Sequence, residues 1–596
     1  MPQRAIAACF LFFVTLCAVS AASATEPLRV LRTMLGIAET SFDPQFASDA
    51  ASDAVISEVY EAMLDYDYLA RPVQLVPRTL EALPTTPDGG RTWIARLKRG
   101  IHFTPDPAFE GRPRELTAAD YAYTYKRLLD PAVASPWLWL LQGKLVGGDE
   151  ARDRAAKTGR FDYDAPLPGL EVVDRYTLRI RLNAPDLRFP FVLAIPYTGA
   201  VAREVVEAYG RDFGARPVGT GAFRLAEYKR SARIVLERNP GYRVETYAPA
   251  GPLPPESQAI AAALRGRRLP ILDRVEISVI EEAQSRWLAF LNGEVDVDSL
   301  VSSTLIDELL VGGRVRPELA AKGIRHEASL RPNTYWVYFN MDDPVVGGYE
   351  PANIALRRAI SMGYDAPEAL RVLSKGRGVL AQSLVPPGIA GHDPGWKFGA
   401  QVHDPAAARA LLDRFGYKDR DGDGFREAPD GKPLVLERWS VPTSAQRQAD
   451  ELWKRNMDAI GLRIVFRKDK LPELRKMARN GRIPFASDGW NADYPDAENF
   501  VQLLYGPNAG QENQSRFRLA EYDRLYRQAR ALPDGPERTA LFGRMQELVV
   551  AYAPIRLTQH IVEDHAWHSR VKHYRAHPIR QFSFRHYDVD GPVPAR

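Results

Sequence analysis

The sequence predicts an α/β protein, because segments with the periods of strands and of helices are mixed along the whole chain. The chain has 596 residues, of which 45% are hydrophobic and 26% are charged, as is usual for a soluble globular protein. This length suffices for several domains or for one large multi-lobed body. The net charge of only +4 provides no field that would attract nucleic acid, so we expect no nucleic-acid partner.

In the first half of the chain, each expected element follows from a local pattern. The clearest helix covers residues 117–129: it begins at Thr117, a good N-cap followed three residues later by Asp120, and it ends at Asp130-Pro131. Alternation of apolar and polar residues indicates strands, and apolar residues three or four positions apart indicate helices. We expect strands over residues 28–37, 92–97, 101–103 and 176–182, and a helix over residues 55–64.

The second half shows the same mixture. Residues 334–340 are rich in aromatic and β-branched side chains, which favour a strand. The other expected strands are 222–228, 232–237, 271–280, 433–439, 555–562 and 579–585, and the expected helices are 282–292, 353–362, 405–415 and 444–460. Segments rich in proline and glycine at 105–114, 248–256 and 384–396 are expected to be loops within the fold.

The first residues have the pattern of a secretory signal peptide. Arg4 precedes an almost wholly apolar stretch over residues 5–22, and Ala22-Ser23-Ala24 offers the small residues that a signal peptidase requires. We therefore expect residues 1–24 to be removed. The alternatives are a membrane anchor and a lipid attached at Cys9, but the apolar stretch is short for a span and continues well past that cysteine.

No motif for catalysis is present in the expected mature chain. Cys9 and Cys17 both lie in the leader, so a thiol nucleophile, a disulfide and a cysteine-bound metal are excluded. The sequence lacks G-x-S-x-G, H-E-x-x-H and Walker-type motifs. Gly219-Thr220-Gly221 lacks the third glycine and the following helix of a dinucleotide-binding loop. We expect no enzyme activity and no cofactor.

An acidic segment at 419–430 partly follows the spacing of a calcium loop. Asp419, Asp421 and Asp423 take the first alternate positions, and Gly424 sits at the turn. The twelfth position, however, holds Asp430 instead of a longer glutamate, and the following residues have a strand pattern rather than a helical one. An acidic β-turn is the favoured interpretation, and a structural calcium site is the alternative.

Histidines form a second candidate group near the carboxyl end. Six of the ten histidines fall between His560 and His586, with two spacings that suit a metal on a helix. The surrounding residues have strand patterns, and His577-Pro578 would interrupt a helix. We therefore favour surface or cleft histidines over a metal site.

Residues 217–225 (PVGTGAFRL) followed by 234–242 (IVLERNPGY) closely resemble a hallmark of the large solute-binding proteins of peptide-type ABC importers. Further segments resemble that family in the family's own order, from about residue 40 to 560. They are Thr117-Ala118-Ala119-Asp120, the stretch 169–182, Leu291-Asn292-Gly293-Glu294-Val295-Asp296, Phe339-Asn340 and 489–496 (GWNADYPD). Departures from the family pattern occur at Ala222-Phe223, at Pro495-Asp496 and in the loop 248–269, and they leave the shape of the cleft open.

The resemblance implies a two-lobed periplasmic-binding-protein fold of class II with an extra third domain and a hinge between the lobes. The first lobe would comprise residues 25–77, 213–325 and 541–596, the added domain residues 78–212, and the second lobe residues 326–540. The implied function is capture of oligopeptides or peptide-like solutes in the periplasm and delivery to an ABC permease in the inner membrane. We expect the protein to be a monomer.

Ligand-binding residues are carried over from the segment 489–496. Asp493 matches the family's acidic residue that meets the peptide α-ammonium, and Trp490 would form a wall of the first subsite. Asn491 and Tyr494, from the same segment, and Tyr338, from the strand over 334–340, are further candidates. The alternatives are an exposed turn acid for Asp493 and a core position for Trp490.

Two other functions remain to be compared. A carrier of a metal, a metallophore or haem on the same fold is suggested by the carboxyl-terminal histidines. A secreted hydrolase would need a nucleophile that the motifs do not provide.

Overall fold

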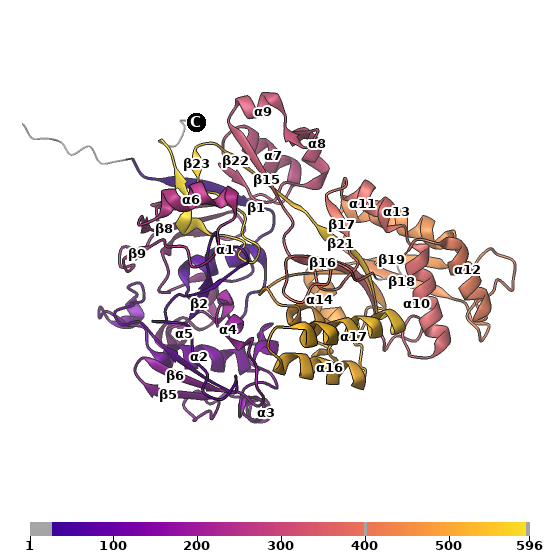
Figure 1. Cartoon of the computed structure of the whole chain (residues 1–596), viewed down its shortest axis with the longest axis horizontal. Coiled ribbons are helices and arrows are strands. Elements are labelled where there is room, and N and C mark those ends of the chain that lie inside the picture. The colour runs from indigo at the N-terminus through magenta and orange to yellow at the C-terminus, as the bar shows by residue number, and fades with distance from the viewer. Residues whose placement is uncertain (1–26, 398–401, 592–596) are drawn as a thin grey trace, which may run out of the picture.

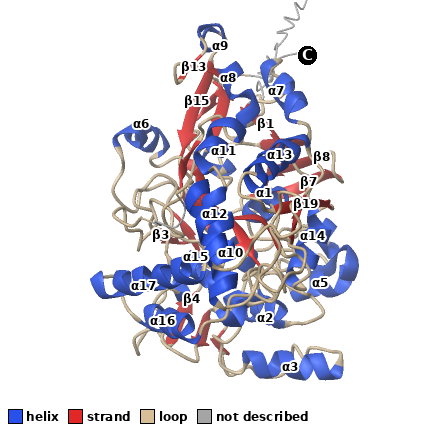
Figure 2. Cartoon of the chain, turned by 90° about the vertical axis from the view of Figure 1, so that its right-hand side faces the viewer, coloured by secondary structure: helices blue, strands red, loops and turns tan. Residues whose placement is uncertain are grey.

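The computed structural model describes residues 27–397 and 402–591, and within them the expected mixture of helices and strands is confirmed (Figures 1 and 2). The predicted leader and both cysteines lie outside the described residues. Among the described residues, no helix is long and apolar enough to span a membrane.

Two large sheets organise the chain. The first has seven strands in the order β15 (Ile324–Ser329), β22 (Glu563–His568), β12 (Val297–Asp298), β1 (Val30–Leu35), β11 (Arg274–Val279), β8 (Arg233–Arg238) and β7 (Phe223–Lys229). The second has six strands in the order β17 (Gly378–Leu380), β21 (Ile555–Ile561), β16 (Asn333–Phe339), β20 (Phe485–Asn491), β18 (Val435–Ser440) and β19 (Arg463–Lys468). Each sheet is the centre of one lobe.

Smaller sheets complete the fold. A three-stranded sheet, β4 (Thr92–Arg96), β6 (Thr177–Arg181) and β5 (Leu170–Asp174), lies in the residues expected to form the added domain. The two-stranded sheets are β2 (Leu64–Tyr66) with β3 (Leu75–Pro77), β9 (Glu245–Thr246) with β10 (Arg268–Leu269), β13 (Leu310–Val311) with β14 (Arg314–Val315), and β23 (Val571–Lys572) with β24 (Asp588–Val589).

The helices divide among the same three regions. Around the first sheet lie α1 (Ala50–Val59), α6 (Pro255–Leu264), α7 (Ala283–Leu291), α8 (Ile306–Leu309) and α9 (Pro317–Ala321), and near the three-stranded sheet lie α2 (Ala118–Leu129), α3 (Gly148–Thr158), α4 (Phe189–Val192) and α5 (Arg203–Tyr209). The second lobe contains α10 (Pro351–Gly363), α11 (Ala366–Leu373), α12 (Pro405–Arg414), α13 (Ser444–Asp458), α14 (Leu471–Arg479), α15 (Glu498–Val501), α16 (Ala520–Ala531) and α17 (Pro536–Tyr552). Helices α10, α12 and α13 lie on the side of the second lobe that faces the viewer in Figure 2.

Local sequence signals explain the best-predicted elements. Helix α2 begins directly after Thr117, whose backbone N–H donates to the Asp120 carboxylate at 2.7 Å, as expected for a capping box. In the second lobe, the apolar side chains of β16, α10 and α13 meet in one core, which includes Val337, Ile360 and Trp453. Burial of these apolar surfaces holds the helices against the sheet.

Two strand predictions are wrong. Residues 101–103 form only an isolated bridge between His102 and Glu115, and β4 pairs with β6 instead. Residues 579–585 contain no strand, and a short 3-10 turn covers Phe584–His586. Ile101 and Phe103 are buried on either side of the exposed His102, and residues 582–585 are all buried, so the apolar side chains of both segments pack against the core without a partner strand for their backbone groups.

The chain crosses from one large sheet to the other twice, and the two crossings lie side by side. The first passage joins β15 to β16, and the second joins β21 to β22. Asn333 ties the passages together, since its amide donates to the Ile561 carbonyl at 3.0 Å and accepts from the Ile561 N–H at 2.7 Å. The expected boundary at 541 falls inside α17, and β21 pairs with β16 and β17 in the second sheet.

The glycines of the segment 217–225 allow α1 and β7 to approach closely. The Gly221 N–H donates to the Val59 carbonyl at 2.9 Å. A Cβ on Gly219 would lie 2.0 Å from the Val59 carbonyl oxygen, and a Cβ on Gly221 would lie 2.2 Å from the Glu58 carbonyl oxygen. These contacts with backbone atoms leave no room for a side chain.

Gly219→Ala is therefore expected to lower the free energy of unfolding by about 1–3 kcal/mol, the usual cost of overpacking. The measurement is a urea unfolding curve. Gly543→Ala is the matched control, because nothing lies within 4 Å of a Cβ at this position in α17, and alanine favours a helix over glycine. Equal midpoints for Gly219→Ala and the wild type would contradict the close approach.

Candidate functional site

Four cavities that share lining residues run from the space between the lobes into the second lobe. Cavity A, of about 210 Å³, is lined by Trp137, Trp139, Asp488, Trp490, Asn491 and Asp493 among others. Cavity B, of about 170 Å³, shares Ser48, Trp137, Asn491 and Asp493 with cavity A. Cavity C, of about 190 Å³, shares Arg475, Asp488 and Gln514 with cavity A, and cavity D, of about 180 Å³, shares Arg438, Gln446, Ser487 and Asp488 with cavity C. Together they form one elongated space.

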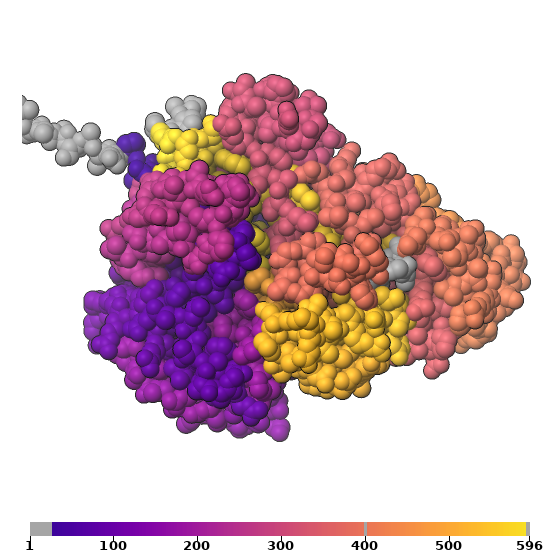
Figure 3. Space-filling view, viewed as in Figure 1, coloured from indigo at the N-terminus to yellow at the C-terminus, as the bar shows by residue number. Residues whose placement is uncertain are grey.

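Aromatic side chains of the two lobes contact one another beside this space. The rings of Trp139 and Trp490 meet edge to face at 6.4 Å, and Phe191 stacks on Tyr494 at 5.7 Å. Trp139 and Phe191 come from the region of the three-stranded sheet, whereas their partners follow or belong to β20. Figure 3 shows the two bodies in contact along a central seam. The structure therefore has the lobes together.

Asp493 lies where cavities A and B meet. Its carboxylate accepts a hydrogen bond from the Asn499 amide at 2.9 Å, and it forms no ion pair with any described residue. Burial raises the pKa of Asp493 to about 7, and the hydrogen bond from Asn499 only partly opposes this effect. An enclosed carboxylate without a counter-ion is suited to bind a cationic group of a ligand.

Asn499 orients both main candidates, although the sequence did not reveal it. This fully buried residue of α15 accepts from the Asp493 backbone N–H at 2.9 Å and from the Trp490 indole N–H at 3.1 Å. Its position within the run Glu498-Asn499-Phe500-Val501-Gln502 was the available signal, since a polar residue that is buried among apolar ones usually has a bonding role.

The other predicted residues are divided between cavity and core. Asn491 is exposed and lines cavities A and B, while Trp490 is half-buried in cavity A. Tyr338 lines cavity C, although it is only 2% exposed. Tyr494 lines none of cavities A–D; its ring is buried and its hydroxyl donates to Glu498, so we interpret it as a packing residue.

A second acidic side chain, Asp488 of β20, lines cavities A, C and D. Burial raises its pKa to about 6, and the hydrogen bond from the Gly489 backbone N–H lowers it in part. Asp488 can line three cavities because β20 lies in the middle of the second sheet.

Buried ion pairs connect the segment after Asp493 with the rest of the protein. Asp496, which is 1% exposed, binds Arg538 at 2.6 Å and Arg188 at 3.0 Å. Asp186 and Arg530 form a neighbouring pair at 2.9 Å. Since Arg188 and Asp186 precede α4 while their partners belong to the second lobe, these pairs fix the lobes next to the site.

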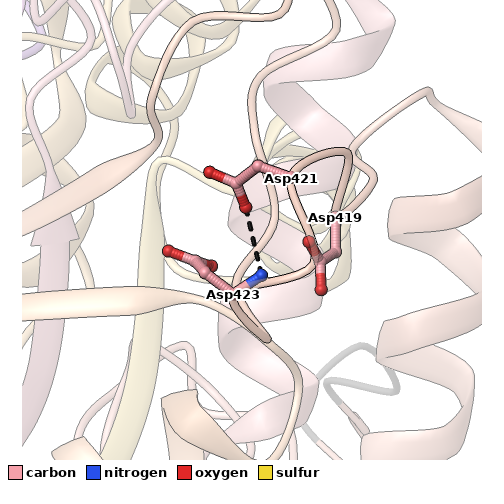
Figure 4. Close-up of side chains that lie close together, drawn as sticks. All are labelled: Asp419, Asp421 and Asp423. Atoms are coloured by element: carbon pink, nitrogen blue, oxygen red, sulfur yellow. Dashed lines mark hydrogen bonds between the residues drawn. The ribbon is translucent and has the colours of Figure 1, made fainter.

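In the acidic turn at 419–430, the side chains of Asp419, Asp421 and Asp423 are exposed and lie close together (Figure 4). Ligand atoms of Asp419, Asp421 and Asp423 lie within 4.8 Å of one another. Their oxygens accept hydrogen bonds from the loop itself, including one from the Gly422 N–H to Asp419 at 2.7 Å, and Asp423 also pairs with Arg463. Asp430, the twelfth position, pairs with Lys432 at 2.7 Å instead. This geometry supports the acidic-turn interpretation.

The carboxyl-terminal histidines are dispersed. Among the described residues, no group of three potential metal ligands includes a histidine, and none of the four cavities is lined by one. His560 contacts the Asn333 carbonyl at 2.7 Å, His568 contacts the Phe290 carbonyl at 2.8 Å, and His586 stacks on Tyr68. Their contacts are those of structural residues.

Known proteins of similar sequence have similar length. The chain is 24% identical over 565 residues to Heme-binding protein A of Haemophilus influenzae, with 93% of this chain and 91% of that protein covered. It is 23% identical over 586 residues to Di/tripeptide-binding protein 2 of Pseudomonas aeruginosa, with 96% and 97% covered.

The fold matches that of a solved binding protein. The structure of the Escherichia coli murein tripeptide-binding protein MppA superposes with a TM-score of 0.72 at 20% identity, covering 94% of this chain and 98% of that chain. The unliganded open form of MppA gives a TM-score of only 0.62 with the same coverage. The expected two-lobed fold is confirmed.

The sequence profile of bacterial extracellular solute-binding proteins, family 5 Middle, matches residues 74–512, which include the added region, the glycine-rich segment and the site around Asp493. The chain therefore belongs to the bacterial extracellular solute-binding proteins of family 5.

Proposed function

We propose that this protein captures a short peptide or peptide-like solute in cavities A–D in the periplasm and delivers it to the permease of an ABC importer. The observation that carries the proposal is the enclosed carboxylate of Asp493, which faces an elongated cavity without a counter-ion. A peptide supplies the missing cation as its α-ammonium group. The names of the Pseudomonas aeruginosa and Escherichia coli proteins, both peptide binders, agree with this ligand class. We propose that the protein acts as a monomer and as a carrier without enzyme activity.

Strand β20 offers the ligand a backbone edge. On one side it pairs with β16 along its whole length, from Phe485 to Asn491. On the other side, β18 pairs only with Phe485 and Ala486. Residues 487–491 therefore have no strand partner on that side among the described residues, and most of them line the cavities. An extended peptide that starts at Asp493 can add to this edge as a strand.

Separation of the lobes would admit the ligand, and closure would exclude water from it. In the closed space each hydrogen bond and ion pair becomes stronger, because the local dielectric constant falls. The two passages tied by Asn333 are the short segments about which the lobes would move. The pockets beside the peptide backbone leave room for water, which would let the protein accept different side chains.

Peptide affinity is expected to depend on pH through Asp493. The carboxyl has a pKa of about 7 without ligand, and a bound ammonium favours its ionised form, so binding below pH 7 must release a proton. Affinity should thus fall by up to tenfold for each pH unit below 7, and it should fall again above about pH 8 as the peptide amine loses its charge.

Isothermal titration calorimetry with trialanine from pH 5 to pH 9 measures this profile. Asp493→Asn should remove the acidic limb, since no proton remains to be released. No detectable binding of any di- to pentapeptide at pH 7.5 would contradict the proposed function, and a flat profile in the wild type would contradict the role of Asp493.

A further inference from the structure

Cavity B extends from Asp493 on the side opposite to cavity C, and the proposed peptide does not account for its polar groups. It is lined by residues from seven separate segments, including Asp53 of α1, Tyr66 of β2 and Arg331 between β15 and β16. Ile195, Tyr197 and Trp137 supply apolar walls. The cavity volume of about 170 Å³ is large enough for one extended side chain.

Two oxygen-bearing groups of cavity B have no partner among the described residues. Tyr66 is 3% exposed, and its buried hydroxyl makes no hydrogen bond. The half-buried carboxylate of Asp53 accepts no hydrogen bond and forms no ion pair. Burial raises the pKa of Asp53, while Arg580 and Arg331 act on it only at longer range and lower it in part. Unpartnered buried polar groups are costly, so their presence in a cavity points to a ligand.

The arginines of cavity B each lie near a carboxylate outside the cavity. Arg580 lies 3.5 Å from Asp65, which also binds Arg585 at 2.6 Å, and Arg580 donates to the Ser57 carbonyl at 3.4 Å. Arg331 lies 3.7 Å from Glu563 and donates to the Ile579 carbonyl at 3.2 Å. Asp53 and Asp493 are the carboxylates lining cavity B that form no ion pair with a described residue.

We propose that cavity B is a subsite for a cationic side chain on the first residue of the ligand, held by the Asp53 carboxylate and the Tyr66 hydroxyl oxygen. This inference rests on the proposed function, because the α-ammonium at Asp493 sets the position of the first residue. Arg331 also has a buried Nε–H without an acceptor among the described residues, which suits the first carbonyl oxygen of the peptide. The preferred ligands are peptides that begin with lysine, arginine or ornithine.

Calorimetry with Lys-Ala-Ala, Ala-Ala-Ala and Glu-Ala-Ala at pH 7.5 tests the subsite. Lys-Ala-Ala should bind at least tenfold more tightly than Ala-Ala-Ala, and Glu-Ala-Ala should bind most weakly. Equal affinity for all three, or a preference for glutamate, would overturn the subsite and leave peptide capture intact. No binding of any of the three would contradict peptide capture and the subsite with it.

Variants assign the preference to named side chains. Asp53→Asn should reduce the ratio of the Lys-Ala-Ala and Ala-Ala-Ala affinities to about one. Tyr66→Phe, which removes only the hydroxyl, should reduce the ratio in part and serves if Asp53→Asn fails to fold. Asp153→Asn is the charge control, since this exposed acid of α3 does not line cavity B. A ratio that is unchanged in both cavity variants would overturn the proposal.

Discussion

Replacing Asp493 with asparagine is expected to weaken binding of a free-amino peptide by at least tenfold, within the range of about 2–5 kcal/mol for an unpaired buried charge. The substitution keeps the size of the side chain and a hydrogen-bonding group for Asn499, so the fold should be retained. What is lost is the negative charge that faces the ligand ammonium in a closed cavity.

Calorimetry at pH 7.5 measures the loss, and circular dichroism checks the fold. Asp421→Asn is the matched control, because this acid lies in the exposed turn at 419–430 and lines none of cavities A–D. Wild-type affinity in the Asp493 variant would remove this residue from the site. A similar loss in the Asp421 variant would show that the net charge of the protein, and not the cavity, controls binding.

The largest expected effect on stability belongs to Asp496. Its buried carboxylate binds two guanidinium groups, those of Arg538, which is 2% exposed, and Arg188, which is 10% exposed. Asp496→Asn would leave two largely buried cations with only the exposed carboxylate of Asp534 as a shared partner, and breaking a buried ion pair from one side costs about 3–5 kcal/mol. The midpoint of urea unfolding should therefore fall clearly below that of the wild type.

Asp342 provides a close control for this substitution. It also binds two arginines, Arg516 at 2.6 Å and Arg518 at 3.0 Å, but it is 47% exposed. Asp342→Asn should cost at most about 1 kcal/mol, as usual for exposed ion pairs. Equal shifts of the unfolding midpoint in the two variants would show that burial of Asp496 does not determine the cost of its substitution.

Local signals in the sequence predict those elements that depend on interactions between residues close together in the chain. The helix after Thr117 follows from its capping residues, and β16 follows from an alternating aromatic run. Residues 101–103 and 579–585 have similar patterns but no neighbouring strand to pair with, and a pattern in one segment contains no information on its partner.

The residues of the candidate site also differ in whether a local signal in the sequence identifies them. Asp493, Trp490 and Asn491 lie in one continuous segment and could be found by its resemblance to a family. Cavity B is assembled from Asp53 and Tyr66 near the start of the chain, Arg331 in its middle and Arg580 near its end, and only the fold brings them together. Their individual neighbourhoods contain no motif, so the sequence could not identify them as one site.

Acetylation of the peptide amine tests the central claim most directly. Calorimetry would compare trialanine with N-acetyl-trialanine at pH 7.5, using the same wild-type protein. The acetyl group removes the charge that Asp493 is proposed to receive and leaves the rest of the ligand unchanged. We predict that the acetylated peptide binds at least tenfold more weakly. Equal affinity for the two peptides would contradict recognition of the peptide amino terminus in the cavity between the lobes.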